Sequence, residues 1–355
     1  MFSPRVWLGG LCLALLGGCA QVPTAQLGAA RFGYGQEVAE SWKRQALMNV
    51  VRLRYNDAPA FLDVSAVVTS DSLSTRIQAG ATAANTPADS KLDFGAGGTW
   101  TSAPTVTFSP ISGERFSKRL LEPLPPTSVL LLVQAGWPID LVWPTTVTTV
   151  NGLQGSRMGA PADPEFVALQ QVLARMQRSS AVGFRVRQEE GREGVFMVLH
   201  RSTVPQAAED LRTLRELLGL NPGASQFTLT QGELPRNDRE LAINTRSMFE
   251  LMQEMGLGVD IPPEHLRKAR SMDEFGRTAT NGSPPSHYRP MVSIRSGKTA
   301  PKDHYAAIQY KDYWFWIDDE DEQTKRLFTF LMILFSLSET SPPMNAPVLS
   351  ISPAR

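Results

Sequence analysis

A two-residue alternation of apolar and polar side chains runs from Ser72 to Phe108 and restricts what this part of the chain can form. Successive side chains of a β-strand point to opposite faces, whereas a helix requires a period near 3.6 residues. A polar loop at 84–90 divides the alternation into two stretches. One face would carry Leu73, Ile77, Leu92, Phe94, Trp100 and Phe108, and the other Arg76, Gln78, Asp93 and Thr99. The sequence therefore predicts a long amphipathic β-hairpin.

The rest of the chain alternates between helical and strand-like patterns. Helices are predicted where apolar residues recur every three or four positions, at 36–55, 114–121, 127–135, 163–178, 206–218, 247–255 and 320–337. Strands are predicted in short β-branched or aromatic segments, at 139–150, 184–187, 195–200, 227–230, 240–244, 291–295 and 305–317. The order strand, strand, helix occurs three times. We therefore predict an α+β fold of antiparallel sheets with helices, built from repeated strand-strand-helix units, plus the long N-terminal amphipathic β-hairpin.

The N-terminus has the pattern of a secretory signal. One positive charge at Arg5 precedes an apolar stretch at 6–16, which is too short to span a bilayer because a spanning helix needs about 20 residues. Residues 16–19, Leu-Gly-Gly-Cys, resemble the lipobox of bacterial lipoproteins. In that family the cysteine is acylated on its sulfur and the chain is cleaved before it. We therefore expect 1–18 to be a signal peptide and Cys19 to be the lipidation site.

The positions of the two cysteines agree with an exported, anchored protein. Cys12 lies inside the signal, so the mature chain would hold Cys19 alone and could form no internal disulfide. The lipobox resemblance further implies passage to the outer membrane, because Ala20 replaces the Asp that retains relatives at the inner membrane. The protein would then be lipid-anchored and mainly periplasm-facing. Lys plus Arg and Asp plus Glu both number 35, which gives no charge-based reason to expect nucleic acid as a partner.

Composition shifts suggest where the chain divides. Residues 20–34 mix small residues with Pro and Gly and predict an irregular tether, and 281–290 is rich in Pro. We expect a signal peptide at 1–18, a lipidated tether at 19–34, a helix plus the long hairpin at 35–112, and an α+β body at 113–280. The remaining region, 281–355, would supply a linker, a β-hairpin and an apolar C-terminal helix with a tail.

No catalytic, cofactor-binding or metal-binding residue is predicted. Ser-Gly-Lys-Thr at 296–299 resembles the end of a phosphate-binding loop, but Val292 stands where a glycine is required, so a turn is expected. The acidic run 318–322 is interpreted as a helix cap, with Asp319 and Glu322 at the spacing of a capping box. The histidines are dispersed and form no metal-ligand pattern: His200, His265, His287 and His304.

The C-terminal region is unusually apolar. The helix at 320–337 is apolar on all sides for about three turns, which predicts burial in the core or in a subunit interface. The aromatic segment 310–317 precedes it, and both of its faces are apolar, as in a strand packed on two sides.

These observations lead to three functional hypotheses. Segments 49–59 and 313–319 resemble uncharacterised proteobacterial lipoproteins, which implies no activity. The first hypothesis is a non-enzymatic assembly or scaffold component of the envelope, whose partner is a further copy or another envelope protein. The second is an oligomeric outer-membrane pore or export subunit that uses 72–108, a layout similar to the curli-export type of lipoprotein pore. The third is a periplasmic enzyme of unknown class. For the hairpin itself, a soluble ribbon lying on the α+β body is the favoured interpretation.

Overall fold

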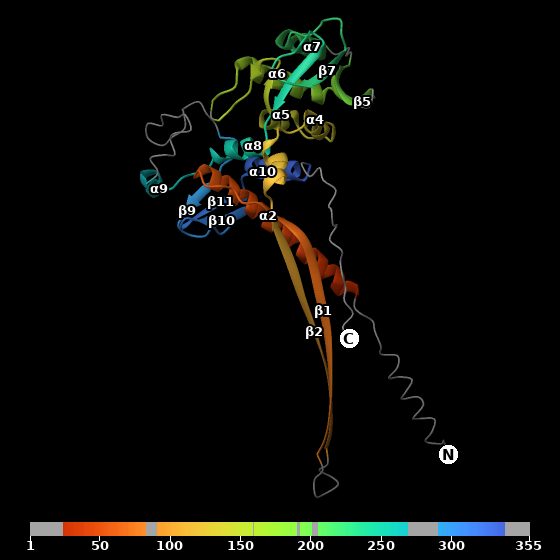
Figure 1. Ribbon diagram of the computed structural model, residues 1–355, viewed down its shortest axis with the longest axis vertical. Helices are drawn as coiled ribbons and strands as arrows, with labels where there is room; N and C mark the ends of the chain where they lie inside the picture. Colours follow the sequence, from red (N-terminus) through yellow and green to blue (C-terminus); the bar gives the residue numbers. More distant parts are fainter. Residues whose placement is uncertain are drawn as a thin grey trace, which may run out of the picture.

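The computed structural model describes residues 24–82, 91–158, 160–189, 192–200, 205–268 and 290–337. The predicted signal peptide, Cys19, the loop at 84–90 and the C-terminal tail therefore lie outside the described residues. The fold is α+β, as predicted: helices pack against a six-stranded and a three-stranded sheet, and a separate two-stranded hairpin extends away from them (Figure 1).

The six-stranded sheet has the order β4-β3-β8-β7-β6-β5. Its strands are β3 Val147–Val150, β4 Leu153–Gln154, β5 Val182–Glu189, β6 Arg192–Leu199, β7 Gln226–Gln231 and β8 Glu240–Thr245. Neighbouring strands are antiparallel except β7 and β8, which run parallel, so the expectation of purely antiparallel sheets needs that one correction. The helices around this sheet are α4 Pro126–Gln134, α5 Ile139–Thr146, α6 Pro164–Arg178 and α7 Pro205–Leu218.

Helix α5 corrects the strand predicted at 139–150, of which only Val147–Val150 is a strand. The β-branched composition was misleading, because the buried positions recur at helical spacing: Ile139, Val142, Trp143 and Thr146. The first turn is completed from outside the helix, since the Ile139 N–H donates to the Gln177 side-chain oxygen at 2.9 Å. Tertiary packing therefore outweighs the local strand propensity here.

A second group of elements forms the part of the body next to the hairpin. It contains α2 Thr24–Arg54, α3 Gly113–Phe116, the π-helical turn η2 Ser117–Leu121, α8 Met248–Gly256, α9 Pro263–Lys268 and α10 Glu322–Leu337. The three-stranded sheet, in the order β10-β11-β9, consists of β9 Arg295–Gly297, β10 Ala306–Tyr310 and β11 Tyr313–Ile317. Helix α2 packs against β10, α8 and α10, so the two ends of the described chain meet in this region.

The small sheet differs from the prediction at its turn. The strand predicted at 305–317 is a hairpin, in which Lys311 and Asp312 adopt positive φ values of 46° and 66° between β10 and β11. Two consecutive positive φ values are typical of the tight turns that suit the twist of paired strands. Only one face of β11 is buried, because Trp314 and Trp316 are half-exposed, so packing on both sides is also corrected.

One connected core joins both parts of the body. Among its largest fully buried side chains are Trp143, Phe166, Phe227, Phe315, Phe328 and Phe330. Helix α10 contributes Leu327, Phe328, Phe330, Leu331 and Leu334 to it. Met332, Ile333 and Phe335 are only half-buried, so the helix is not covered on every side as its composition predicted. Its uncovered stripe faces the region from which the hairpin leaves the body.

Helix α2 begins earlier than predicted. It starts at Thr24, within the segment expected to be an irregular tether, because 24–34 contains enough Ala, Gln, Leu and Arg to continue a helix despite its two glycines. From Gly35 to Trp42 its residues are mostly exposed, and burial begins at Ala46. The N-terminal part of α2 therefore projects from the body.

The hairpin is much longer than the average hairpin of a globular protein. Strands β1 Leu62–Thr82 and β2 Lys91–Pro110 pair antiparallel, and at about 3.3 Å per residue the ribbon is roughly 66 Å long. It extends away from the body on the side toward which the N-terminal part of α2 also runs (Figure 1). The favoured expectation, a hairpin lying on the body, is therefore wrong.

Candidate functional site

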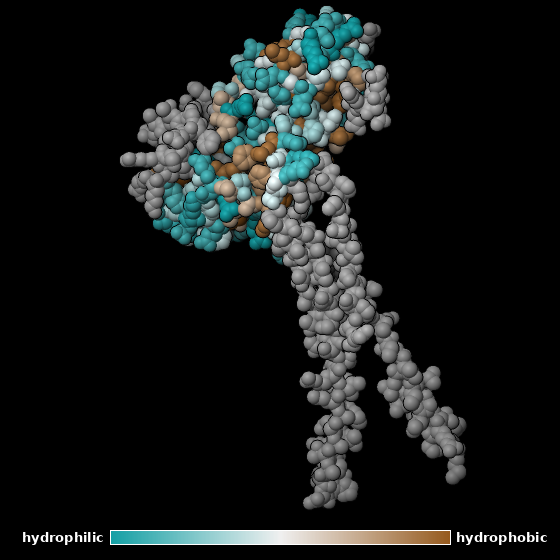
Figure 2. Space-filling view, viewed as in Figure 1, coloured by the Kyte–Doolittle hydropathy of each residue, from teal (hydrophilic) through white to brown (hydrophobic). Residues whose placement is uncertain are grey.

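The root of the hairpin is the candidate functional site, because an apolar groove opens there. The groove encloses about 560 Å³, including its open mouth. Five segments line it: α2, the start of β1, the residue after β2, η2 and the end of α10. Its lining is mainly apolar and consists of Trp42, Ala46, Phe61, Leu62, Ile111, Met332 and Phe335, together with Gln45, Arg119 and Ser336. Hydrophobic side chains gather on this part of the body, above the hairpin (Figure 2).

Phe61 holds the hairpin to the body at this groove. Its side chain is 6% exposed, and its ring centroid lies 5.7 Å from that of Phe335 and 6.5 Å from that of Phe116. Its carbonyl accepts a hydrogen bond from the Ile111 N–H at 2.9 Å, which joins the two ends of the ribbon. In contrast, Trp42 and Leu62 are 40% and 44% exposed. Exposed apolar side chains beside a buried anchor suit the docking of another apolar surface and supply no group for catalysis.

A polar and aromatic cluster brings together the two segments singled out in the sequence. The Tyr55 hydroxyl and His265 Nδ1 are 2.7 Å apart, and the Tyr55 ring packs edge-on against Tyr310 and Phe315. The Tyr310 hydroxyl donates to Asp57, and the Lys311 ammonium pairs with the same carboxylate at 2.8 Å. Segment 49–59 therefore lies against the β10–β11 turn and strand β11 of the three-stranded sheet. The sequences of 49–59 and 313–319 taken separately did not indicate this contact.

The ionisation of this cluster follows from its contacts. Hydrogen bonds from Lys311 and then Tyr310 lower the pKa of Asp57 below its ordinary value. Burial, followed by the bond to Asp57, raises the pKa of Tyr310 to about 12. Burial also raises the pKa of Tyr55, with a further contribution from Tyr310. The tyrosines stay protonated and Asp57 stays ionised at neutral pH, which suits a structural clasp.

The Asn49 side chain holds the backbone of segment 49–59 in place through its hydrogen bonds to Ala60. This side chain is fully buried and makes two 2.9 Å hydrogen bonds to the backbone of Ala60, one as donor and one as acceptor. Asn56 has a positive φ of 57° where the chain leaves α2. These contacts fix the chain that leads from α2 into Phe61, and so they position the hairpin root.

The segments that resembled chemical motifs have structural roles. In 296–299, Ser296 and Gly297 belong to strand β9, so the predicted turn is corrected to a bend at Lys298 and Thr299. The Lys298 ammonium bonds the Glu264 carboxylate at 3.0 Å. In the acidic run, the cap of α10 is Asp321, whose carboxylate accepts from the Thr324 N–H at 3.0 Å; assigning the cap to Asp319 was wrong by two residues. Asp319 instead pairs with Lys325 at 3.2 Å.

The histidines do not converge on a metal site. His265 contacts Tyr55, His200 and His304 are exposed, and His287 lies outside the described residues. Within the described ranges, no group of three or more His, Cys, Asp or Glu side chains is arranged to hold a metal ion. No site residue was predicted in these ranges, and the predicted lipidation site, Cys19, precedes them.

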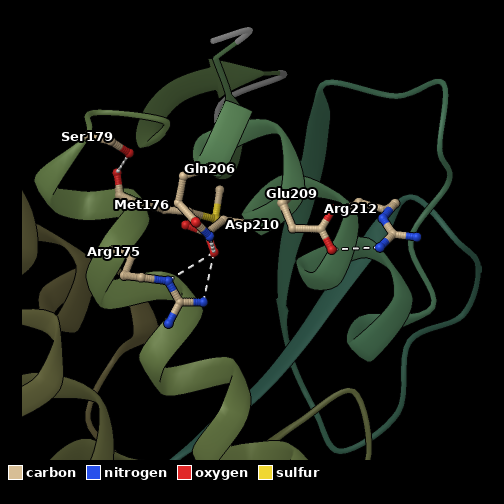
Figure 3. Close-up of polar contacts among 7 residues, drawn as sticks. All are labelled: Arg175, Met176, Ser179, Gln206, Glu209, Asp210 and Arg212. Carbon is tan, nitrogen blue, oxygen red and sulfur yellow. Dashed lines mark hydrogen bonds and ion pairs between the residues drawn. The ribbon is translucent and has the colours of Figure 1, made fainter. Parts of the chain in front are cut away.

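Several buried charges escaped the sequence analysis, among them Asp210 and Arg246. Asp210 of α7, with its side chain 4% exposed, accepts from Nε and Nη2 of Arg175 of α6 at 3.0 and 2.7 Å (Figure 3). Arg246, 2% exposed, donates to the carbonyls of Pro144, Thr145 and Ser156. The sequence signal for the buried Arg246 was its position directly after the largely apolar strand β8. Both charges connect elements of the core, and neither lies in the hairpin-root groove.

Comparisons with protein families, with curated proteins and with solved structures found no match to this chain. Among the described residues, no helix combines the length and the apolar character needed to cross a membrane.

Proposed function

We propose that the protein is an outer-membrane-anchored lipoprotein that acts as a non-enzymatic assembly or scaffold component of the envelope, and that hairpin β1–β2 is the element through which it meets its partner. The observation that carries the proposal is the isolation of this ribbon. It forms a two-stranded sheet of its own, with strands of 21 and 20 residues, and no third described strand pairs with it.

A ribbon of this kind needs a partner for physical reasons. A two-stranded hairpin is at best marginally stable in water, because neither face can be buried within it. Each outer edge also presents a row of N–H and C=O groups that can template pairing with another strand. A partner that adds strands to β1 or β2 satisfies those groups. The partner is a second copy of the chain or another envelope protein.

The helix that leads to the predicted lipid anchor runs to the same side of the body as the hairpin (Figure 1). Helix α2 begins at Thr24, five residues after Cys19, and its N-terminal part leaves the body on the side of the hairpin (Figure 1). An acylated Cys19 would therefore hold the membrane on the side to which the ribbon extends. Several acyl chains on one residue give stable attachment, since each buried methylene adds about 0.8 kcal/mol.

The anchor is tested by replacing the cysteine. In Cys19→Ala, labelling with radioactive palmitate should disappear and the protein should leave the membrane fraction. Cys12→Ala is the matched control, because it changes the other cysteine within the same precursor and should keep both label and location. Palmitate labelling that persists in Cys19→Ala would contradict the proposal.

A second candidate function, an oligomeric pore or export subunit, is favoured by the hairpin register. Leu73 lies opposite Trp100, Ile77 opposite Ala96 and Ala79 opposite Phe94, so the apolar positions of both strands share one face. The register shift between Val64 and Ala66 also leaves Val64 and Val67 on that face, opposite Phe108 and Val106. Strands that are apolar on one face and polar on the other suit a ring of hairpins with lipid outside and water inside.

The pore hypothesis makes a prediction about the tip of the hairpin. A cysteine introduced in the loop as Asn85→Cys should react with a membrane-impermeant thiol reagent on intact cells. A cysteine placed in the body at an exposed site, Gln323→Cys, should react only after the outer membrane is permeabilised. If Asn85→Cys also requires permeabilisation, the pore hypothesis fails and the scaffold proposal stands.

A further inference from the structure

Two parts of the molecule leave the body on the same side, and their lengths can be compared. Trp42 of α2 and Leu62 of β1 line one groove, so they mark a common starting level. From Trp42 back to Thr24, at about 1.5 Å per residue, α2 extends roughly 27 Å. From Leu62 to Thr82, at about 3.3 Å per residue, the hairpin extends roughly 66 Å.

The reach of the anchor is therefore limited. Cys19 precedes Thr24 by five residues, which adds about 17 Å at most even when fully extended. Cys19 then lies within about 44 Å of the groove, and the hairpin extends at least about 22 Å farther than the anchor can. The apolar band of an outer-membrane protein is about 25 Å tall. The hairpin therefore reaches farther than the anchor by a distance close to the height of this apolar band.

The hairpin sequence changes character within the reach of the anchor. Counting about 3.3 Å per residue, the farthest level that the anchor can reach, about 44 Å from Leu62, corresponds to positions near 75 of β1. Just before it, Asp71 pairs with Ser102 on the face that carries Leu73 and Trp100. A carboxylate on a lipid-facing position costs several kcal/mol near the centre of a bilayer and little at its boundary. We therefore place the boundary of the apolar part of the bilayer between the level of Asp71 and the level of Leu73.

Beyond this polar pair the face is consistently apolar or small. The distal positions on it are Leu73, Thr75, Ile77, Ala79 and Ala81 of β1 with Leu92, Phe94, Ala96, Gly98 and Trp100 of β2. Each strand contributes ten residues from there to the tip, and a tilted strand needs about 9–11 residues to span a membrane. Trp100 lies at the boundary itself, where aromatic side chains are enriched in membrane proteins.

We propose that the distal half of the hairpin, 73–82 with 91–100, is a lipid-binding surface that enters the outer-membrane bilayer, and that the proximal half, 62–72 with 101–110, is a spacer between the body and the membrane. The proposal rests on the proposed acylation of Cys19, which fixes the membrane level. It also assigns Val67 and Val106 to water or to a neighbouring chain, although they share a face with the lipid-facing positions. The polar face and the edges of the distal half are covered by neighbouring hairpins of an oligomer.

Photochemical capture of lipid distinguishes the two halves. A diazirine-bearing residue is introduced in the full-length protein at Ile77 or at Val67, which lie on the same face at different levels, and intact cells are irradiated. Mass spectrometry of the hairpin peptides should find phospholipid adducts at 77 and none at 67. Phe94 and Val106 form a second matched pair on β2 and should give the same contrast, which protects the test from one poorly folded variant.

The outcomes separate the inference from the function on which it rests. Adducts at both levels would show that the whole ribbon lies in lipid, and adducts at neither level would show that it stays outside; each result overturns the proposal. Palmitate on Cys19 is measured in the same samples. If palmitate is present and position 77 captures no lipid, the depth inference alone fails. If palmitate is absent, the anchoring itself fails.

Discussion

The body and the hairpin differ in how far their polar and apolar groups find partners within the described chain. In the body, helices and two sheets share one core, and even buried charges such as Asp210 and Arg246 are hydrogen-bonded within the chain. In the hairpin, β1 and β2 pair only with each other among the described strands. We therefore expect the body to be stable by itself and the hairpin to need a membrane or a partner.

The largest effect is expected in the body, at α10. Leu331 is fully buried, and Leu331→Asp places an unpaired carboxylate in the core, which should lower the free energy of unfolding by roughly 4 kcal/mol or more. Ile333 is half-buried on the same helix, so Ile333→Asp should cost at most about half as much, because water can reach the new carboxylate. Thermal unfolding followed by circular dichroism compares the two. Equal losses would mean that the uncovered stripe of α10 is covered in solution.

A smaller effect is expected where the body fixes the hairpin root. Asn49→Ala removes two part-buried hydrogen bonds between a fully buried side chain and the Ala60 backbone, which should cost about 2 kcal/mol. Gln36→Ala on the exposed part of α2 is the matched control and should change stability by less than about 0.5 kcal/mol. Denaturant unfolding measures both. If the two variants are equally stable, Asn49 does not hold this connection.

The Asp57 and Tyr310 clasp should give a weaker, pH-dependent contribution. The pKa of Tyr310 is raised to about 12, so its stabilisation is complete below the unfolded value near 10 and is lost as the pH rises toward 12. The pKa of Asp57 is lowered, so its contribution is present above about pH 4 and is lost as the pH falls further. Tyr310→Phe should therefore reduce the alkaline decline in melting temperature between about pH 10 and 12.

Tyr305→Phe serves as the control for this clasp, because the Tyr305 hydroxyl has only a 3.4 Å contact with Thr329. Its alkaline decline should match that of the parent. An unchanged alkaline decline in Tyr310→Phe would show that the clasp does not contribute to stability.

The smallest effect on the body is expected from shortening the hairpin. Replacing 70–103 with an Asn-Gly turn joins Thr69 to Pro104, which are already paired in the register. Because β1 and β2 form a two-stranded sheet of their own among the described strands, the melting temperature of the body should change by less than about 2 °C. A drop of 10 °C or more would show that the body depends on the ribbon, and the division between the two regions would fail.

The sequence was informative where one pattern dominated and misleading where two competed. The helical stripe of α6 and the two-residue period of the hairpin both predicted elements that the structure contains. At 139–146, β-branched residues indicated a strand although Ile139, Val142 and Trp143 also had helical spacing, and burial favoured the helix. The turn at Lys311 contains neither Gly nor Pro, so no local signal divided β10 from β11.

The candidate site was harder to predict than the elements. The groove at the hairpin root combines residues of α2, β1 and α10 that are up to about 290 positions apart, and nothing local to Trp42 or Phe335 indicates that they meet. The Tyr55 cluster likewise depends on how 49–59 docks on the small sheet. By contrast, the resemblance to a lipobox rests on four adjacent residues, and the acylation that it implies stays a prediction.

The mass of the complex extracted from membranes in mild detergent tests the central claim most directly. If the hairpin is the assembly element, the full-length protein should migrate as a complex of several chains, and the variant shortened between Thr69 and Pro104 should migrate as a single acylated chain. Native mass spectrometry or analytical ultracentrifugation measures both. A parent protein that is a single chain, with the same association state as the shortened variant, would contradict the claim.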